Sequence, residues 1–363
     1  RWTMSAAQMR VGEAVVDLLA RHYGADTVFG IPGVHNIELF RGLHRSGVRT
    51  IAPRHEQGAG FMADGWSVVT GRPGICVLIS GPGLTNALTP MGQAYHDSRP
   101  MLVLASTTPT DALGQHIGPL HDLVDQAAIA RSVCAMSETV LDPADVPRLV
   151  AAAWDVFTSG RPRLVHLAFP TDVLERLVEP FVPVAPSGRR PVADPSAVER
   201  AAATLARATS PVVIAGGGAI DASSILVEVA ERLDAPVLLT GNAKGVVPSR
   251  HPLCADTALG FAAVQRSVEQ CDAVLVVGTE LSDTDLYNGG RALQFAGPVV
   301  RIELEHSAAG MLPLVASPMR FSETPIKHEV PPPVVGQHSD EILRNVLKKT
   351  DAQIAQLRSG GIV

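Results

Sequence analysis

Short apolar runs alternate with longer, helix-length stretches through the first half of the chain. From residue 26 to residue 170 these runs are four to seven residues long. Such alternation is typical of a parallel sheet with helices on both faces. The predicted strands span residues 27–31, 48–52, 75–80, 101–106, 133–136 and 164–169, and the predicted helices span residues 36–46, 56–70, 85–97 and 143–158. We therefore expect one doubly wound α/β domain over residues 5–178.

A proline-rich stretch then interrupts the alternation. Residues 179–195 contain Pro180, Pro183, Pro186 and Pro191 and are typical of an extended linker. After it, the pattern predicts helices at 197–208 and 223–233 and strands at 211–215, 236–240, 273–277 and 299–304. We expect a second, smaller Rossmann-like domain with a parallel sheet over residues 196–305. Residues 306–363 form a tail, with a proline-rich arm followed by two short helices at 339–347 and 351–357.

Three predicted strands are followed by turn-forming residues, which should lie at the same edge of the sheet. These turns lie at residues 30–35, 54–56 and 80–86, and two of them contain Pro-Gly. Ligands of open α/β sheets bind outside the carboxyl ends of the strands, so we expect the three turns to converge. A single Pro-Gly is usually a tight turn, and a lone Glu at a helix start is usually a favourable dipole partner. Their combination makes Glu56 the leading candidate for a catalytic group.

Composition narrows the class of protein. Apolar residues make up 46% of the 363 residues and charged residues 18%, and no run approaches the roughly 20 apolar residues of a membrane span. The chain has 30 basic and 36 acidic residues, and it contains no long basic run, which argues against a nucleic-acid surface. The four cysteines occur singly, without a CxxC pair, and indicate reduced core residues of a cytoplasmic protein.

Two other patterns are candidates for ligand sites. His116 and His121 are five residues apart, which does not place them on one helix face as a metal pair requires, so we expect no metal site in this chain. Residues 216–218 are three consecutive glycines after a predicted strand, a pattern compatible with a phosphate-binding turn. The sixth position from Gly216 is Asp221 rather than Gly or Ala, which favours a plain strand-to-helix turn.

The segments around these turns resemble the pyrimidine-binding domain of thiamine diphosphate-dependent enzymes. The similarity is carried by residues 28–53, 54–65, 81–86 and 161–172, and residues 211–219, 235–240, 244–248 and 251–252 resemble the central domain of that family. It covers about residues 5–305. The acetolactate synthase-like branch is the most similar. Within it, residues 30–35, 54–65 and 120–126 resemble 2-oxo acid decarboxylases of the 5-guanidino-2-oxopentanoate type.

The resemblance implies that Glu56 is the catalytic carboxylate. It would hydrogen-bond a ring nitrogen of the cofactor's aminopyrimidine and help to move the proton that activates the cofactor. Such proton transfer favours a carboxyl group shielded from water, and Phe61 and Met62 are expected to contribute to this shielding. Decarboxylases and carboligases share their early steps, so both activities fit Glu56.

The resemblance also implies roles for residues around Glu56. Pro32 and Gly33 would lie near the aminopyrimidine, and Asn86 would lie near the same ring. Four further residues are candidates to face the substrate, although local hydrogen bonds within loops explain them equally well: His35, His116, His121 and Gln126. The implied cofactor is thiamine diphosphate with Mg²⁺, and the implied substrate is a 2-oxo acid. The implied assembly is a homodimer or tetramer, and flavin in the central domain is left open.

One part of the family pattern is missing from the chain. Family enzymes hold the metal and the diphosphate with a Gly-Asp-Gly segment of a third domain, and no Gly-Asp-Gly occurs here. The tail, at about residues 312–363, instead resembles the C-terminus of family III CoA-transferases, through residues 317–325, 331–333, 336–343 and 351–363. We therefore expect a junction between Glu305 and Leu312 that makes the chain a chimera.

Three functions follow from these observations. The first is a thiamine diphosphate-dependent decarboxylase or acetolactate synthase-like enzyme that is incomplete, or that is completed by a subunit supplying the diphosphate-binding domain. The second is a catalytically silent assembly protein of the same ancestry. The third is a CoA-transferase, favoured only by the tail.

Overall fold

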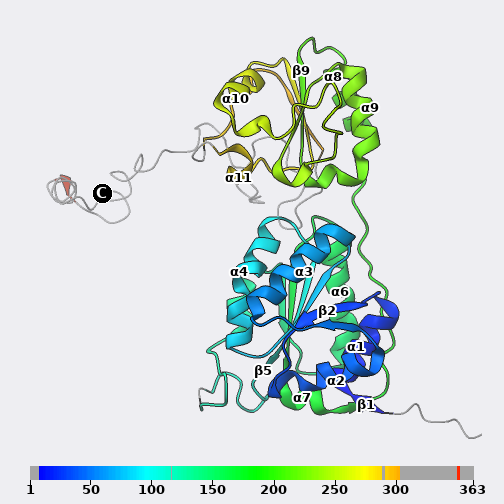
Figure 1. The fold of residues 1–363 in the computed structure, drawn as a ribbon, viewed down its shortest axis with the longest axis vertical. Helices are drawn as coiled ribbons and strands as arrows, with labels where there is room; N and C mark the ends of the chain where they lie inside the picture. The colour runs from blue at the N-terminus through cyan, green and yellow to red at the C-terminus, as the bar shows by residue number, and fades with distance from the viewer. Residues whose placement is uncertain (1–7, 116, 288–290, 303–349, 352–363) are drawn as a thin grey trace, which may run out of the picture. The chain divides into compact units, whose positions relative to one another are not determined.

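The computed structural model describes residues 8–115, 117–287, 291–302 and 350–351 (Figure 1). Its largest sheet has six strands, all parallel, in the order β3-β2-β4-β5-β7-β6. The strands are β2 (Thr27–Gly30), β3 (Arg49–Ile51), β4 (Gly74–Leu78), β5 (Met101–Thr107), β6 (Met136–Thr139) and β7 (Leu164–Pro170). A short antiparallel pair, β1 (Met9–Arg10) and β8 (Leu177–Val178), joins the two ends of this part of the chain. The predicted doubly wound sheet is confirmed.

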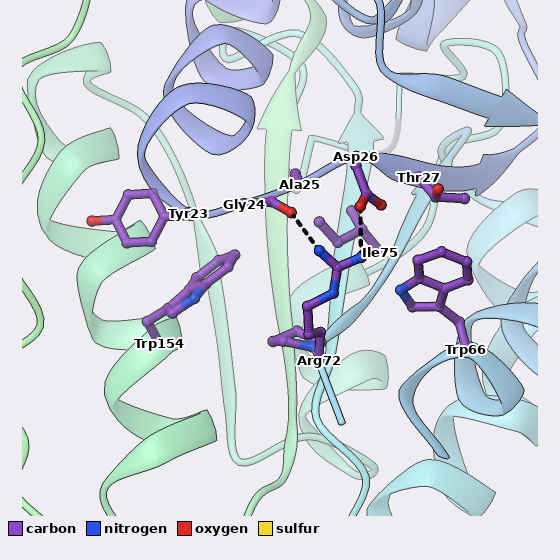
Figure 2. Close-up of a pocket in the computed structure, with 10 residues that line it drawn as sticks. Tyr23, Gly24, Ala25, Asp26, Thr27, Trp66, Arg72, Ile75 and Trp154 are labelled. Atoms are coloured by element: carbon purple, nitrogen blue, oxygen red, sulfur yellow. Dashed lines mark hydrogen bonds and ion pairs between the residues drawn. The ribbon is translucent and has the colours of Figure 1, made fainter. Parts of the chain in front are cut away.

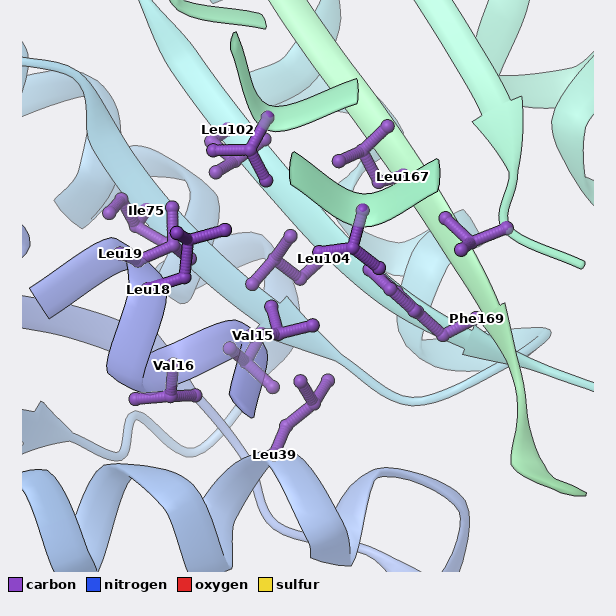
Figure 3. Close-up of a cluster of buried hydrophobic side chains, with 14 of the residues drawn as sticks. Val15, Val16, Leu18, Leu19, Leu39, Ile75, Leu102, Leu104, Leu167 and Phe169 are labelled. Carbon is purple, nitrogen blue, oxygen red and sulfur yellow. The ribbon is translucent and has the colours of Figure 1, made fainter. Parts of the chain in front are cut away.

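Helices cover both faces of the six-stranded sheet. One face packs against α1 (Val11–His22), α2 (Ile37–Ser46), α6 (Val146–Thr158) and α7 (Thr171–Glu175). The other packs against α3 (Glu56–Thr70), α4 (Pro82–His96) and α5 (Gln126–Arg131). Successive residues of a strand point to opposite faces, so Ile75 joins the first core and Cys76 the second. Figure 3 shows the first core, in which Val15 of α1 and Leu39 of α2 pack with Leu104 of β5.

The second sheet has four parallel strands in the order β10-β9-β11-β12. They are β9 (Pro211–Ala215), β10 (Val237–Leu239), β11 (Ala273–Val277) and β12 (Val299–Ile302). Helices α8 (Pro195–Leu205) and α9 (Ser223–Leu233) contribute to the core on one face, and α10 (Ala262–Glu269) and α11 (Asp283–Leu286) to the core on the other. Short 3-10 helices lie at Val34–Asn36, Pro143–Asp145, Gly217–Ala222, Gly241–Ala243 and Ala258–Gly260. The predicted α/β fold of this part of the chain, with a smaller parallel sheet, is thereby confirmed.

The three-glycine turn after β9 serves close backbone packing. A Cβ at Gly218 would lie 2.9 Å from Cα of Gly278, and a Cβ at Gly216 would clash with the carbonyl of Gly278. The amides of Gly216 and Gly218 donate to Val277 and Gly278 across the sheet. The glycines therefore let two strand ends meet, which supports the plain-turn interpretation.

Several predicted boundaries are corrected. The strand predicted at 133–136 is wrong, because residues 133–135 are a turn after α5 and β6 begins only at Met136. Val133 and Cys134 are apolar because they pack into the helical side of the core. The helix predicted to start at residue 85 begins at Pro82, where proline is favoured in the first turn. Helices α1, α5, α7, α10 and α11 were not predicted. The tail helices predicted at 339–347 and 351–357 lie outside the described residues, apart from Asp351.

The close contact between α3 and α4 depends on a glycine. Gly60 of α3 is buried against Pro90, which lies inside α4, and a Cβ at Gly60 would lie 2.8 Å from the Cβ of Pro90 and closer still to its Cγ. Ala59 and Ala63 of the same helix are fully buried. Small residues therefore set the distance between the two helices. Gly65, on the outer side of α3, faces open space.

These two glycines predict opposite effects of the same substitution. Gly60→Ala should destabilise the fold by about 1–3 kcal/mol, because overpacking forces the helices apart. Gly65→Ala, the matched control, should stabilise it by up to about 1 kcal/mol, because alanine has the higher helix propensity. Urea unfolding of both variants measures the difference, and equal effects would contradict the proposed contact.

A histidine is buried within the six-stranded sheet. His166 of β7 is fully buried, and its Nδ1 lies 2.9 Å from the hydroxyl of Ser137 on β6. Because that hydroxyl donates to the carbonyl of Ala127, the imidazole Nδ1–H is the donor to Ser137. Nε2 is buried without a hydrogen-bond partner among the described residues. Burial lowers the pKa of His166 to about 3.

Acid should therefore destabilise the fold through His166. The unfolded chain takes up a proton at this histidine near its ordinary pKa of 6.5, whereas the folded chain does so only near 3. Stability is thus fully present above pH 6.5 and is lost as the pH falls towards 3, by up to about 1.4 kcal/mol per pH unit. His166→Gln should flatten this dependence in urea unfolding between pH 7 and pH 5, and parallel curves would refute the role.

Candidate active site

The carboxyl ends of three neighbouring strands form the candidate site. Strands β3, β2 and β4 are adjacent in the sheet, so the turns that follow them lie side by side. Glu56 is the first residue of α3, and His55 caps the helix by accepting a hydrogen bond from the amide of Gln57 at 3.2 Å. The predicted convergence of the three turns is confirmed.

A hydrogen bond joins two of the predicted site residues. The side-chain amide of Asn86, in α4, donates to Oε2 of Glu56 at 3.0 Å. Oε1 of the same half-buried carboxylate has no hydrogen-bond partner among the described residues. One oxygen is therefore fixed by the protein, and the other is available to a ligand.

Ile79 lies beneath both Pro-Gly turns. A Cβ at Gly33 would lie 2.5 Å from Cδ1 of Ile79, and a Cβ at Gly83 would lie 2.5 Å from its Cγ2. The same Cβ at Gly83 would lie 3.7 Å from Oε1 of Glu56. Glycine at these two positions therefore lets the turns pack closely against Ile79. Glycine at position 83 also leaves Oε1 of Glu56 uncovered on that side.

Asn36 braces the turn that contains Pro32 and Gly33. Its side-chain oxygen accepts from the amide of Gly33 at 2.8 Å, and its side-chain amide donates to the carbonyl of Ile31 at 3.1 Å. Asn36 is fully buried. The turn is thereby held in one shape, with Pro32 between the two bonded residues.

Two histidines meet beside this turn. Nδ1 of His35 lies 2.5 Å from the hydroxyl of the buried Ser80, and the rings of His35 and His121 are 5.6 Å apart in an edge-on arrangement. Burial, followed by the nearby His121, lowers the pKa of His35 below its ordinary value, so this imidazole is neutral at pH 7. His121 has a positive φ of 62°, and its Nδ1 is buried without a hydrogen-bond partner among the described residues.

Gln126 follows the second of its two interpretations, that of an amide engaged in local hydrogen bonds. Its side-chain oxygen accepts from the amide of Gly81 at 3.1 Å, and its side-chain amide donates to the carbonyl of Ser106 at 2.8 Å. Because the residue is buried and both ends of its amide are engaged with the backbone, a structural role is favoured over contact with substrate. His116, the remaining substrate candidate, lies outside the described residues.

The predicted shielding of Glu56 by Phe61 and Met62 is wrong within a single copy of the chain. Phe61 and Met62 are each 44% exposed on the outer side of α3, so they do not shield the carboxylate. Other contributors were missed in the sequence: Asn36, Ile79, Ser80 and Ser106. Asn36 could have been identified from the sequence, because it lies three residues after a glycine and next to a helix start. Ile79, Ser80 and Ser106 could not, because their contacts join segments that are distant in the sequence.

The described residues of the site offer an open carboxylate oxygen and no cluster of metal ligands. Among the residues that the structure describes, no three His, Cys, Asp or Glu side chains are grouped to hold a metal ion. A carboxylate with one open oxygen beside a glycine turn suits hydrogen bonding and proton exchange with a ring nitrogen. The donor set of this half of the site is therefore compatible with an aminopyrimidine.

Within the described ranges, no helix is both long enough and apolar enough to span a bilayer.

Comparisons with known proteins match both sheets. Residues 9–129 match the N-terminal thiamine pyrophosphate (TPP) binding domain of thiamine pyrophosphate enzymes, and residues 198–324 match their central domain. The central-domain match extends past the junction predicted between Glu305 and Leu312, which remains a prediction.

Three relatives illustrate the similarity. The chain is 45% identical over 299 residues to the "Probable 2-ketoarginine decarboxylase" of Pseudomonas aeruginosa, covering 82% of this chain and 53% of that protein. It is 32% identical over 315 residues to an acetolactate synthase of Arthrospira platensis, with the same two coverages. It is 33% identical over 281 residues to a sulfoacetaldehyde acetyltransferase of Rhodobacter capsulatus, covering 76% of this chain and 46% of that protein.

The chain thus spans about half the length of these relatives. The matches include strands β2 to β5 of the first sheet, the turns around Glu56, and all four strands of the second sheet. The chain belongs to the thiamine pyrophosphate enzyme family, in the group that contains acetolactate synthases and 2-oxo acid decarboxylases.

Proposed function

We propose that this chain forms the aminopyrimidine-binding and central parts of a thiamine diphosphate-dependent enzyme that acts on a 2-oxo acid, as a decarboxylase or carboligase. The observation that carries the proposal is the state of Glu56. Asn86 holds one of its carboxylate oxygens, and the other is open beside the glycine turn at Gly83.

Glu56 is the proposed catalytic residue. Thiamine diphosphate, when bound, supplies the electron sink for cleaving the bond next to a keto carbon. Oε1 of Glu56 would hydrogen-bond a nitrogen of its pyrimidine ring and exchange a proton with it. Asn86 keeps the carboxylate in place through Oε2, and the turn at Pro32 and Gly33, fixed by Asn36, bounds the position of the ring.

The pair formed by His35 and His121 is the proposed contact for the substrate. Imidazoles donate and accept hydrogen bonds, so they can hold a 2-oxo acid, and the lowered pKa of His35 keeps that ring compatible with a cation at the far end of the substrate. The similarity to the 2-ketoarginine decarboxylase supports a guanidino 2-oxo acid as the substrate. His35 is anchored by Ser80, and His121 presents a buried nitrogen that needs a partner.

The diphosphate and Mg²⁺ would be held by parts outside the described residues. No metal cluster occurs within those residues, and the sequence has no Gly-Asp-Gly. A further domain or a partner subunit would supply this half. The competing function is a silent assembly protein, which keeps the fold and binds no cofactor.

The outer side of α3 is the proposed contact between copies of the chain. Val68 and Val69 are exposed there together with Phe61 and Met62, and Val69 has 85% of its surface exposed. An apolar helix face of this kind is typical of an interface. We infer a homodimer or a tetramer that covers it.

Replacing the carboxylate tests the proposed cofactor site. Glu56→Gln should weaken binding of thiamine diphosphate with Mg²⁺ at least about tenfold in calorimetric titration. The substitution puts a neutral amide, which cannot exchange a proton with the ring, in place of the carboxylate. Glu138→Gln, which removes an exposed carboxylate on β6, is the matched control and should bind as wild type does. Equal affinity of wild type and Glu56→Gln would show that the carboxylate does not contact the cofactor. Tight binding by wild type would exclude the silent assembly protein, and absence of binding would leave only an activity completed by a partner that supplies the diphosphate-binding half.

A charge on α3 tests the proposed interface. Val69→Asp should raise the dissociation constant of the oligomer at least about tenfold, because the interface would bury an unpaired carboxylate. Val192→Asp, at an equally exposed valine of the proline-rich stretch, should leave it unchanged. Sedimentation equilibrium measures both, and a wild-type monomer or an unaffected oligomer would refute the interface.

A further inference from the structure

A hollow lies at the edge of the six-stranded sheet opposite to Glu56. It opens at the amino ends of β2 and β4 and has a volume of about 200 Å³ (Figure 2). Its walls come from four segments: residues 23–27 after α1, Trp66 of α3, residues 72–75 around the start of β4, and Trp154 of α6. Trp66 is ten residues after Glu56 on the same helix, about 15 Å along its axis. The hollow is therefore separate from the candidate active site.

Its aromatic walls are held in place by neighbouring side chains. The ring of Trp154 lies 4.6 Å from that of Tyr23, and the ring of Trp66 packs edge-on against Phe29 at 6.1 Å. The Tyr23 hydroxyl donates to the carbonyl of Val184 at 2.6 Å. Both tryptophans are only partly buried, although each packs against a neighbouring aromatic ring. The hollow thus offers two accessible indole surfaces to a ligand.

The charged groups of the hollow neutralise each other. Arg72 donates to the carboxylate of Asp26 at 2.7 Å and to the carbonyl of Gly24 at 3.4 Å, and its guanidinium carbon lies 5.6 Å from the centre of the Trp66 ring. Figure 2 shows the guanidinium between the two indoles. The pKa of Asp26 is lowered, mainly by the hydrogen bond from Arg72. The carboxylate and the guanidinium therefore form an ion pair at pH 7. A charged ligand would have to compete with this pair, whereas an uncharged one would not.

We propose that this hollow binds an uncharged, planar heteroaromatic molecule of one or two fused rings, such as a nucleobase. Aromatic rings stack favourably on indoles and on arginine, and the hydrogen-bonding edge of a base can meet the polar edge formed by Asp26, Gly24 and Arg72. The volume lies below the roughly 300–1,000 Å³ of pockets for drug-sized ligands, which fits a ligand of this size. The site is independent of the proposed thiamine diphosphate chemistry.

Adenine is a suitable probe because it is planar and uncharged at pH 7. The chain has three tryptophans, two of which line the hollow, so fluorescence and the indole N–H resonances report on it directly. Adenine should change the fluorescence saturably and shift the resonances of Trp66 and Trp154. Cyclohexanecarboxamide, which is uncharged but not planar, should do neither, and adenosine monophosphate should bind more weakly than adenine because of its charge. A response to cyclohexanecarboxamide equal to that of adenine would overturn the proposal.

Variants separate this site from the proposed cofactor site. Trp154→Leu should weaken adenine binding about tenfold or more, because it removes the stacking surface. Trp154→Phe, which keeps a flat ring and tests the same position if the leucine variant does not fold, should retain most of the affinity. Glu56→Gln should bind adenine as wild type does. No saturable response in wild type, unchanged affinity in Trp154→Leu, or loss of binding in Glu56→Gln would each overturn the proposal.

Discussion

Parallel pairing of β3, β2 and β4 places three turns at one edge of the sheet, and the candidate site depends on this constraint. The order of the strands brings the turn after β2 next to the turn after β4, with the start of α3 beside them. Glu56 and Asn86 are 30 residues apart in the sequence and are joined by a hydrogen bond of 3.0 Å. Without parallel pairing, the turns that carry Glu56 and Gly83 would not lie side by side.

Close packing beneath these turns sets the precision of the site. Gly60 lets α3 approach Pro90 of α4, and the two helices carry Glu56 and Asn86 at their amino-terminal ends. Ile79 supports both Pro-Gly turns, and the side chain of Gln126 links the amide of Gly81 to the carbonyl of Ser106 in β5. The candidate ligand-binding side chains therefore differ in their hydrogen bonding. Glu56 has one carboxylate oxygen without a partner among the described residues, whereas both ends of the Gln126 amide are bonded to the backbone.

The sequence predicted the fold class and the convergence of the turns because both follow from local signals. Alternating apolar runs indicate a covered parallel sheet, and a Pro-Gly or a helix-opening Glu marks a strand end. The environment of Gln126 was not predictable in the same way, since its partners Gly81 and Ser106 are 45 and 20 residues away. The strand expected at residues 133–136 failed because apolar residues that face a helix look like those that face a sheet. The aromatic hollow combines four distant segments, so no single stretch of sequence signals it.

The central claim is that Oε1 of Glu56 is directed at the pyrimidine ring of thiamine diphosphate. A crystal structure of the chain with thiamine diphosphate and Mg²⁺, together with any partner needed for binding, tests it most directly. We expect a pyrimidine nitrogen within about 2.6–3.2 Å of Oε1, with Asn86 still bonded to Oε2. A pyrimidine ring bound elsewhere, with Oε1 facing solvent or another protein group, would contradict the account.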